Sequence, residues 1–207
     1  MLQVHDFLVP EHGLQVEETL AAGDAQGAIH LARYWWAWQH VKGRVWDLGC
    51  GCGYGTRILC EQKPNVSAVI GVDMERRGIL LARSEFNHPL TEYVQADVGG
   101  FDWPTELDAP ADVVVCFELL NRLSNPAVFL ETLIKRMAPD GKFLLSLPLS
   151  DTGDFTSAVR VYPRKLIFAL LARYFARVEN VSAADSATLL LAPGAIAGLI
   201  KCDELRV

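Results

Sequence analysis

The chain has 207 residues, of which 51% are hydrophobic and 21% are charged, and its formal net charge at pH 7 is −6. This length suits one α/β domain with a full core and leaves too little chain for two. Because acidic residues outnumber basic ones by 25 to 19, the composition argues against a nucleic-acid partner. The longest weakly polar run, residues 188–200, is interrupted by Pro193 and Gly194 and is too short to span a bilayer.

The N-terminal sequence MLQVHDFLVPEHG has no basic flank followed by an apolar core, so it is not typical of a signal peptide and we expect a cytoplasmic protein. The chain has five cysteines, an odd number. Cys50 and Cys52 have no other Cys or His near them at the spacing of a zinc site. We therefore expect reduced, partly buried thiols and no metal site.

The first strand and its turn are predicted in VWDLGCGCGYGT, residues 45–56. Its apolar start is typical of a buried strand, and glycines follow at the alternate positions 49, 51, 53 and 55. Because glycine has no side chain, the backbone N–H groups of such a turn can approach a bound molecule closely. Tyr54, Ile58 and Leu59 then recur at helical spacing. The segment therefore predicts a strand, a glycine loop and a helix that together bind a nucleotide-like ligand.

Strands and helices alternate through the rest of the chain. Further strands are predicted over residues 66–73, 92–96, 112–117, 143–147, 176–181 and 194–201, with another candidate at 188–191. Helices are predicted over residues 75–87 and 164–174. A third helix is predicted to begin after an Asn125 cap, with Pro126 in its first turn, and to carry an apolar stripe as far as Met137. Residues 138–141 are predicted to form the turn that ends it. This order predicts an α/β fold with a Rossmann-like doubly wound sheet, mostly parallel with an antiparallel last strand, and helices on both faces.

The glycine spacing separates two classes of ligand. A dinucleotide-binding loop needs G-x-G-x-x-G, but Tyr54 and Thr56 stand at the third glycine in the registers that begin at Gly49 and Gly51. The segment instead resembles the first motif of the class I S-adenosylmethionine (SAM) methyltransferases, in which an acid, here Asp47, precedes G-x-G-x-G by two positions. Such an acid suits the ammonium group of SAM and would repel a phosphate.

The resemblance extends over roughly residues 28–148. GVD, QADV and the segment from DVVVCFELLNRLSNP to FLLSLP are similar to small bacterial SAM methyltransferases, including those of sugar and polysaccharide pathways, and to ubiquinone-type O-methyltransferases. In that family the segment before the first strand often covers the cofactor, and this implies that Arg33 pairs with the methionine carboxylate. Trp35, Trp36 and Trp38 are expected to pack that helix on the sheet, with an aromatic acceptor wall as the alternative.

Residues at the ends of the predicted strands are expected to hold the cofactor. Asp73, at the end of the strand after the loop, suits both ribose hydroxyls, with a helix N-cap as the alternative. Met74 offers an apolar surface to adenine. The resemblance implies that Asp97 accepts from the adenine amino group beside the backbone of Val98, and a turn former is its alternative. The expected cofactor-binding residues are Arg33, Asp47, Gly49, Cys50, Gly51, Gly53, Asp73, Met74, Asp97, Val98, Phe117 and Glu118, with ordinary core packing as an equal alternative for Phe117.

The acceptor side departs from the family. Many relatives follow the fourth strand with Glu-x-x-Glu-His, which can bind a metal or supply a base, but here Glu118 is followed by Asn121 and Arg122. The N-P-P-Y/F tetrapeptide of enzymes that methylate amide or nucleobase amino groups is absent. No catalytic residue is assigned, and the side chains considered as a base are His5, His12, His30, Asp151, Asp154 and Tyr162. Arg160 and Tyr162 are expected near the acceptor.

We therefore expect one domain over residues 1–207, with a helical segment at 1–43 over the cofactor, a SAM-binding core at 44–147, and an acceptor-side loop with C-terminal strands at 148–207. The expected function is metal-free, in-line transfer of a methyl group from SAM to a small molecule, leaving S-adenosylhomocysteine. The methyl group is expected on an oxygen or a nitrogen atom of the acceptor, and a sugar or polysaccharide precursor is among the acceptors considered. A homodimer is one oligomeric state considered for the protein. The alternatives are a non-catalytic protein that binds SAM or a partner and an NAD-dependent oxidoreductase.

Overall fold

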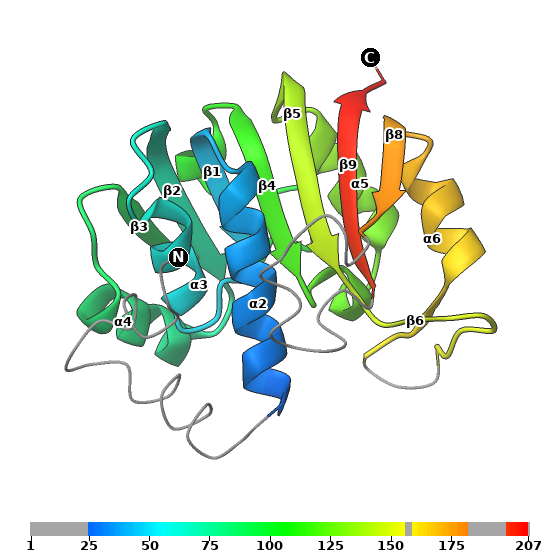
Figure 1. Cartoon of the computed structure of the whole chain (residues 1–207), viewed down its shortest axis with the longest axis horizontal. Helices are drawn as coiled ribbons and strands as arrows, with labels where there is room; N and C mark the ends of the chain where they lie inside the picture. The colour runs from blue at the N-terminus through cyan, green and yellow to red at the C-terminus, as the bar shows by residue number, and fades with distance from the viewer. Residues whose placement is uncertain (1–24, 156–158, 182–197, 207) are drawn as a thin grey trace.

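The computed structural model describes residues 25–155, 159–181 and 198–206, and Figure 1 shows their arrangement. The helices are α2 (Ala25–His40), α3 (Tyr54–Cys60), α4 (Arg76–Glu85), α5 (Pro126–Ile134) and α6 (Arg164–Leu171), with the 3-10 helices η2 (Thr105–Leu107) and η3 (Leu120–Arg122). The strands are β1 (Gly43–Leu48), β2 (Val66–Asp73), β3 (Thr91–Gln95), β4 (Ala111–Phe117), β5 (Met137–Ser146), β6 (Leu149–Ser150), β7 (Tyr162–Pro163), β8 (Phe175–Asn180) and β9 (Leu199–Leu205).

One seven-stranded sheet forms the centre of the molecule, in the order β3-β2-β1-β4-β5-β9-β8. The strands from β3 to β5 are parallel to their neighbours, whereas β9 is antiparallel to both β5 and β8. β6 and β7 form a separate short pair. The strand order reverses between β1 and β4, which is where an open α/β sheet binds its ligand. The predicted doubly wound sheet with an antiparallel last strand is confirmed.

Helices cover both faces of this sheet. α2 crosses one face in front of β1 and β4, and α5 lies behind the sheet (Figure 1). Successive strand residues point to opposite faces, so Val45 and Val113 pack with Trp36 of α2, while Trp46 packs in a different cluster with Phe129 of α5. The two helical layers therefore bury both surfaces of the central strands.

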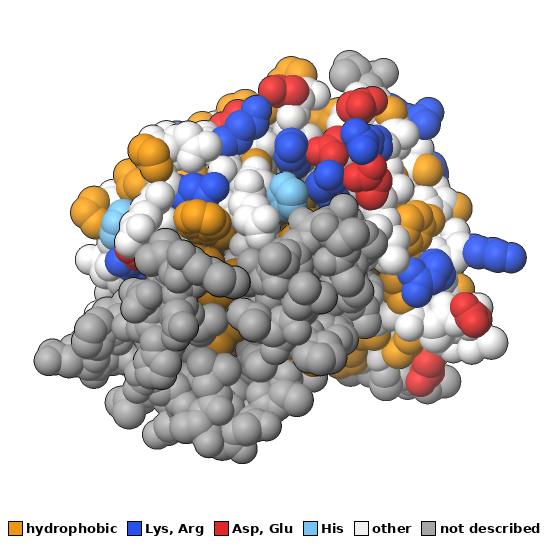
Figure 2. Space-filling view, viewed as in Figure 1, with side chains coloured by type: hydrophobic (Ala, Val, Ile, Leu, Met, Phe, Trp, Pro, Cys, Tyr) orange, Lys and Arg blue, Asp and Glu red, His pale blue; other side chains and the backbone are white. Residues whose placement is uncertain are grey.

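The α2 face also carries a band of charged side chains over β5, β9 and β8. The Lys201 Nζ lies 3.1 Å from the Glu179 Oε2 and 3.8 Å from the Asp203 Oδ2. The Lys142 Nζ lies 3.9 Å from the Asp203 Oδ1, and Arg177 also pairs with Glu179. Figure 2 shows acidic and basic side chains gathered in this part of the surface. We call these five residues the charged band.

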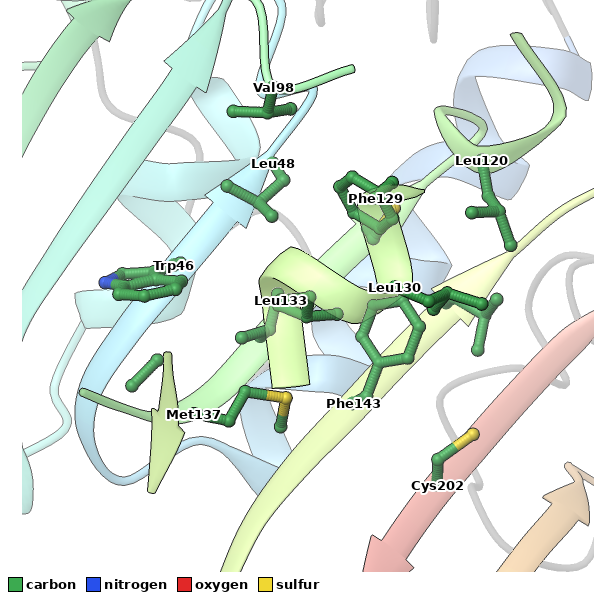
Figure 3. Packing of buried hydrophobic residues seen from close by; sticks show 14 of the residues in the cluster. Trp46, Leu48, Val98, Leu120, Phe129, Leu130, Leu133, Met137, Phe143 and Cys202 are labelled. Atoms are coloured by element: carbon green, nitrogen blue, oxygen red, sulfur yellow. The ribbon is translucent and has the colours of Figure 1, made fainter. Parts of the chain in front are cut away.

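The larger core cluster lies between the sheet and α5 (Figure 3). Leu130 and Leu133 of α5 lie among the side chains of Trp46 on β1 and Phe143 on β5. α5 begins as predicted, because the Asn125 side chain accepts from the backbone N–H of Val128 at 3.3 Å and proline occupies the first turn. β2 also has the predicted bounds.

The end of α5 differs from the prediction. The apolar stripe was expected to reach Met137, but α5 ends at Ile134 and Met137 begins β5. Residues 138–141, predicted as a turn between helix and strand, lie inside β5, where the pairing with β4 shifts register between Ala111 and Val113. The turn residues therefore bulge out of the strand ladder instead of preceding it.

The C-terminal elements differ in extent. The strand predicted over 194–201 is observed as β9 and continues to Leu205, while residues 194–197 and the candidate strand at 188–191 lie outside the described residues. α6 ends at Leu171, before the predicted end at Tyr174. None of the helices in the described ranges is long and apolar enough to cross a membrane.

Of the three tryptophans in α2, Trp36 is the one that is fully buried, at 1% exposed. Trp35 and Trp38 are half-buried and meet edge to face, with ring centroids 6.0 Å apart. The Trp38 Nε1 donates to the carbonyl of Glu61, just after α3, at 2.8 Å. The prediction that all three pack α2 on the sheet therefore holds for Trp36, and Trp38 packs α2 against the end of α3.

Candidate functional site

The loop after β1 is fixed by backbone hydrogen bonds to the end of β2. The N–H groups of Gly49 and Cys50 both donate to the carbonyl of Val72, at 2.8 and 3.1 Å. The N–H of Gly51 donates to the Asp73 Oδ2 at 2.9 Å. Gly51 has a φ of 56°, and nothing lies within 4 Å of the place a Cβ would take. The loop therefore turns at Gly51 with open space beside its backbone.

The next two glycines admit neighbouring parts of the protein. A Cβ on Gly53 would lie 2.5 Å from the Ala82 Cβ of α4, and a Cβ on Gly55 would lie 2.0 Å from the Tyr34 ring of α2. Only hydrogen fits at such distances. The contribution of Gly53 is therefore to let α4 approach the loop, and it is not among the residues that line the two cavities described below.

Asp47 lies behind the loop. Its side chain is 0% exposed and accepts from the Tyr34 hydroxyl, at 3.1 and 3.3 Å, and from the Thr56 Oγ1 at 2.6 Å. Burial raises the pKa of Asp47 to about 7, and the hydrogen bonds from Thr56 and Tyr34 oppose that rise. A fully buried carboxyl has no surface for the predicted contact with a ligand ammonium group. Asp47 instead ties α2, β1 and α3 together.

Two cavities, of about 290 and 730 Å³, meet over the loop and share Gly49, Asp73, Leu119 and Arg122. The small cavity lies between the loop, α2 and the end of β4, and the large cavity follows the ends of β2 and β3. The predicted residues on their walls are Gly49, Cys50, Gly51, Asp73, Phe117 and Glu118 in the small cavity and Gly49, Asp73, Met74, Asp97 and Val98 in the large one. Together they form one cleft at the point where the strand order reverses.

Asp73 ends β2, and each oxygen of its carboxylate already accepts one backbone hydrogen bond. The Gly51 N–H donates to Oδ2, and the Glu75 N–H donates to Oδ1 at 2.8 Å. A carboxylate accepts about four hydrogen bonds, so each oxygen retains a place for a ligand donor. The N-cap of α4, considered as an alternative role, is Glu75, whose side chain accepts from the Arg77 N–H at 3.0 Å.

The large cavity combines an apolar side chain with an acidic one. Met74 is 69% exposed, and Val98 is buried. The Asp97 Oδ1 accepts from the Gly99 N–H at 2.8 Å, so the turn-forming role is present and uses one of its two oxygens. These neighbours offer a flat ring both an apolar surface and a hydrogen-bond acceptor.

Glu118, directly after β4, is the polar centre of the small cavity. Its Oε1 accepts from the Arg33 Nη1 at 2.7 Å and from the Ser146 Oγ at 3.3 Å, and its Oε2 accepts from the Asn121 Nδ2 at 3.4 Å. Its φ of 54° lies in the left-handed region, which is strained for a residue with a Cβ. Arg33 is itself buried, so this ion pair fixes α2 to the ends of β4 and β5.

The wall of the small cavity also includes four residues without a predicted role in cofactor binding: Tyr34, Tyr54, Leu119 and Arg122. Tyr34 contacts Tyr54 and Phe117 edge to face, with ring centroids 5.5 and 5.2 Å apart. Burial, followed by the charge of Asp47, raises the pKa of Tyr34 well above its usual value. Only proximity to the motif in sequence could have suggested Tyr54, whereas Tyr34 belongs to the segment that the family resemblance implies to cover the cofactor.

The residues considered as bases are dispersed. His30 lies on the wall of the small cavity, Tyr162 is buried in the core beside Phe155, and Asp151 and Asp154 are exposed. His5 and His12 lie outside the described residues. Arg160 lies beside the large cavity, because its guanidinium donates to the carbonyl of Leu123 on the wall of that cavity, and its backbone N–H donates to the Asn121 carbonyl at 2.9 Å.

All five cysteines are free, and Cys52 is the one that is not buried. Burial, followed by the charges of Asp47 and Asp73, raises the pKa of the Cys50 thiol. A protonated thiol is a weak nucleophile, so Cys50 lines the cavity as a small neutral group. Within the described ranges, no cluster of three or more His, Cys, Asp or Glu side chains is arranged to hold a metal ion.

A family model described as a methyltransferase domain matches residues 17–189. The chain is 32% identical over 104 residues to a trans-aconitate 2-methyltransferase of Azoarcus sp. (strain BH72). This match covers 50% of this chain and 38% of that protein. It is 31% identical over 109 residues to the mitochondrial ubiquinone biosynthesis O-methyltransferase of Schizosaccharomyces pombe, and this match covers 50% of this chain and 37% of that protein. The chain thus spans less than two fifths of the length of these relatives.

Among solved structures, the plantazolicin methyltransferase BpumL in complex with SAH matches with a TM-score of 0.62. The match covers 92% of this chain and 90% of that chain at 13% sequence identity. At this identity the likeness concerns the fold.

Proposed function

The chain belongs to the family of methyltransferase domains, and we propose that it transfers a methyl group from SAM to a small-molecule acceptor. The observation that carries this proposal is the meeting of three features on one cleft. These are the open backbone at Gly51, the carboxylate of Asp73 and the carboxylate of Glu118, which Arg33 holds in place. They suit an amino acid joined to a nucleoside and lack the phosphate-binding glycine spacing of dinucleotide sites.

We assign the parts of SAM to the two cavities. The large cavity takes the nucleoside, with the ribose at Asp73 and the adenine at Met74, Asp97 and Val98. The small cavity takes the amino-acid part along Gly49, Cys50, Gly51 and Phe117. The positive ammonium group of an amino acid suits the Glu118 carboxylate on this wall, which Arg33 holds in place from behind.

When bound, SAM supplies a methyl group that its sulfonium has already activated. The chain's own task is to orient an acceptor behind that methyl group and to exclude water. The walls favour this, because Tyr34, Cys50 and Phe117 are buried. The proposed transfer needs no metal, since the carboxylate of Glu118 is engaged by Arg33, Ser146 and Asn121.

The acceptor is a small molecule, and both O- and N-methylation are compatible with the cleft. Methylation of a sugar or polysaccharide precursor stays a prediction, as do a homodimer and the division at residues 43 and 147. We propose a cytoplasmic location, because the five cysteines are free and such thiols persist in reducing compartments.

A second candidate function is SAM binding without transfer. It is favoured by the departure from Glu-x-x-Glu-His, since Asn121 is 0% exposed and offers nothing to an acceptor.

Calorimetric titration with SAM, S-adenosylhomocysteine and NADH tests the proposal. We expect both sulfur ligands to bind and NADH to bind far more weakly; equal affinity for NADH and SAM would revive the oxidoreductase alternative. Transfer of a labelled methyl group to an acceptor panel, with and without EDTA, then separates an enzyme from a binding protein. Loss of transfer in EDTA would contradict the metal-free reaction.

A further inference from the structure

Arg122 stands where the small and large cavities join, and it lines both of them. It is the last residue of η3, which begins three residues after the end of β4, and it is exposed. Its Nε donates to the Glu118 carbonyl at 3.0 Å, which holds the side chain against the cleft. Because Nε is engaged, the terminal nitrogens of the guanidinium remain for a ligand.

The acids around Arg122 already have other partners. Asp73 accepts from the Gly51 and Glu75 N–H groups, and Asp97 accepts from the Gly99 N–H. The carboxylate of Glu118 pairs with Arg33. Within the described residues, Arg122 forms no ion pair, and its side chain makes its one hydrogen bond with the Glu118 carbonyl. A guanidinium in a cleft without a carboxylate partner is suited to bind an anionic group from outside.

Three titratable groups on the wall of the small cavity are protonated, and His30 on the same wall is the candidate base. An arginine cannot accept a proton at neutral pH, so Arg122 cannot serve as the base that the histidine of the Glu-x-x-Glu-His pattern can supply. Burial raises the pKa values of the Tyr34, Tyr54 and Cys50 side chains, which therefore stay protonated. A carboxylic acid is already ionised at neutral pH and needs no base.

We propose that Arg122 determines specificity by binding a carboxylate of the acceptor, so that the substrates are small carboxylic acids. This inference rests on the proposed function. A carboxylate oxygen attacks the methyl carbon, and the bond between that carbon and sulfur breaks with its electron pair left on sulfur. The negative charge of the acceptor and the positive charge of the sulfonium disappear together, and no proton moves.

The test uses the full chain, labelled SAM and matched acceptors: trans-aconitate, succinate, benzoate and cinnamate beside their amides, together with catechol as a neutral hydroxyl acceptor. We expect transfer to at least one acid and little or none to its amide. Arg122→Gln should raise the KM for that acid by about tenfold or more, with a smaller change in kcat and an unchanged affinity for SAM. Arg122→Lys should recover part of the loss.

The matched control is Arg173→Gln, which removes an exposed arginine that lies against Tyr174 and is not on the walls of the two cavities. It should leave the KM unchanged. The inference is overturned if amides or catechol are methylated as well as the acids, if no acid is methylated, or if Arg122→Gln keeps the wild-type KM. Failure of the wild type to bind SAM would instead contradict the proposed function and overturn both.

Discussion

The two halves of the sheet use their charged residues in different ways. In the glycine-loop half, made of β3, β2, β1 and β4, Asp47 and Asp73 accept hydrogen bonds from buried hydroxyls or backbone N–H groups. In the C-terminal half, made of β5, β9 and β8, the charged band pairs side chain with side chain near the surface. Asp47 and Asp73 therefore fix the shape of the backbone around the loop, whereas the charges of the band are close to solvent. We expect substitutions in the first half to cost far more.

The largest effect is expected from the pH dependence of Asp47. Burial raises its pKa from 3.8 to about 7, so the folded state binds this proton more tightly than the unfolded state. The resulting stability is full below about pH 4 and is lost as the pH rises through about 7. Relative to Asp47→Asn, which cannot ionise, the wild type should lose about 4 kcal/mol of unfolding free energy from about pH 4 to 8.

Urea unfolding of both proteins across this range measures the difference directly. Because the comparison is made against Asp47→Asn, contributions from other titrating groups cancel. Parallel stability curves for the two proteins would contradict the raised pKa of Asp47.

Next in size is Asp73→Ala. It should weaken SAM binding by about 3 kcal/mol, or roughly a hundredfold, through the loss of charge-assisted hydrogen bonds to the ribose. Calorimetry measures this, with Glu75→Ala as the control because it removes the neighbouring cap of α4. An unchanged affinity for SAM would disprove the ribose assignment and weaken the contrast between the halves.

Gly55→Ala should lower the unfolding free energy by about 2 kcal/mol, because its Cβ would lie 2.0 Å from the Tyr34 ring. Thermal unfolding should show a lower Tm. Gly100→Ala is the control, since nothing lies within 4 Å of its Cβ position. Equal Tm values for these two variants would show that α2 moves aside at little cost.

The smallest effect is expected in the charged band. Lys201→Ala removes the contacts to Glu179 and Asp203 and should lower the unfolding free energy by about 0.5 kcal/mol at low salt. Sodium chloride near 0.5 M should abolish the difference, since salt screens such pairs. A loss as large as that of Gly55→Ala would erase the contrast between the two halves.

The sequence predicts the bounds of an element where a local signal marks them, and fails where pairing between strands decides them. β2 has its predicted bounds because a mostly apolar run ends at an acid, and α5 begins where Asn125 and proline indicate. Met137 was assigned to the helix because an apolar residue fits either element, and only pairing with β4 makes it part of β5. The end of β9 was predicted too early, at Lys201 instead of Leu205, because its charged residues pair across strands and leave no apolar pattern.

For the candidate site, strand ends were a good guide to the cavity walls. Asp73 and Asp97 follow their strands directly, and the rule that ligands bind beyond the carboxyl ends of strands needs no tertiary information. Tyr34 and Arg122 were missed because their approach to the cleft depends on how α2 docks and how η3 turns after β4. Asp47 carries the motif, yet its neighbours Tyr34 and Thr56 enclose it completely.

The Arg33–Glu118 ion pair joins residues 85 positions apart, which bears on the order of folding. Such a distant contact forms only after the intervening strands have assembled, because closing a long loop costs entropy before any contact is gained. The small cavity is therefore completed late, when α2 docks on the ends of β4 and β5. A ligand that needs this cavity would then slow unfolding and leave the folding rate nearly unchanged.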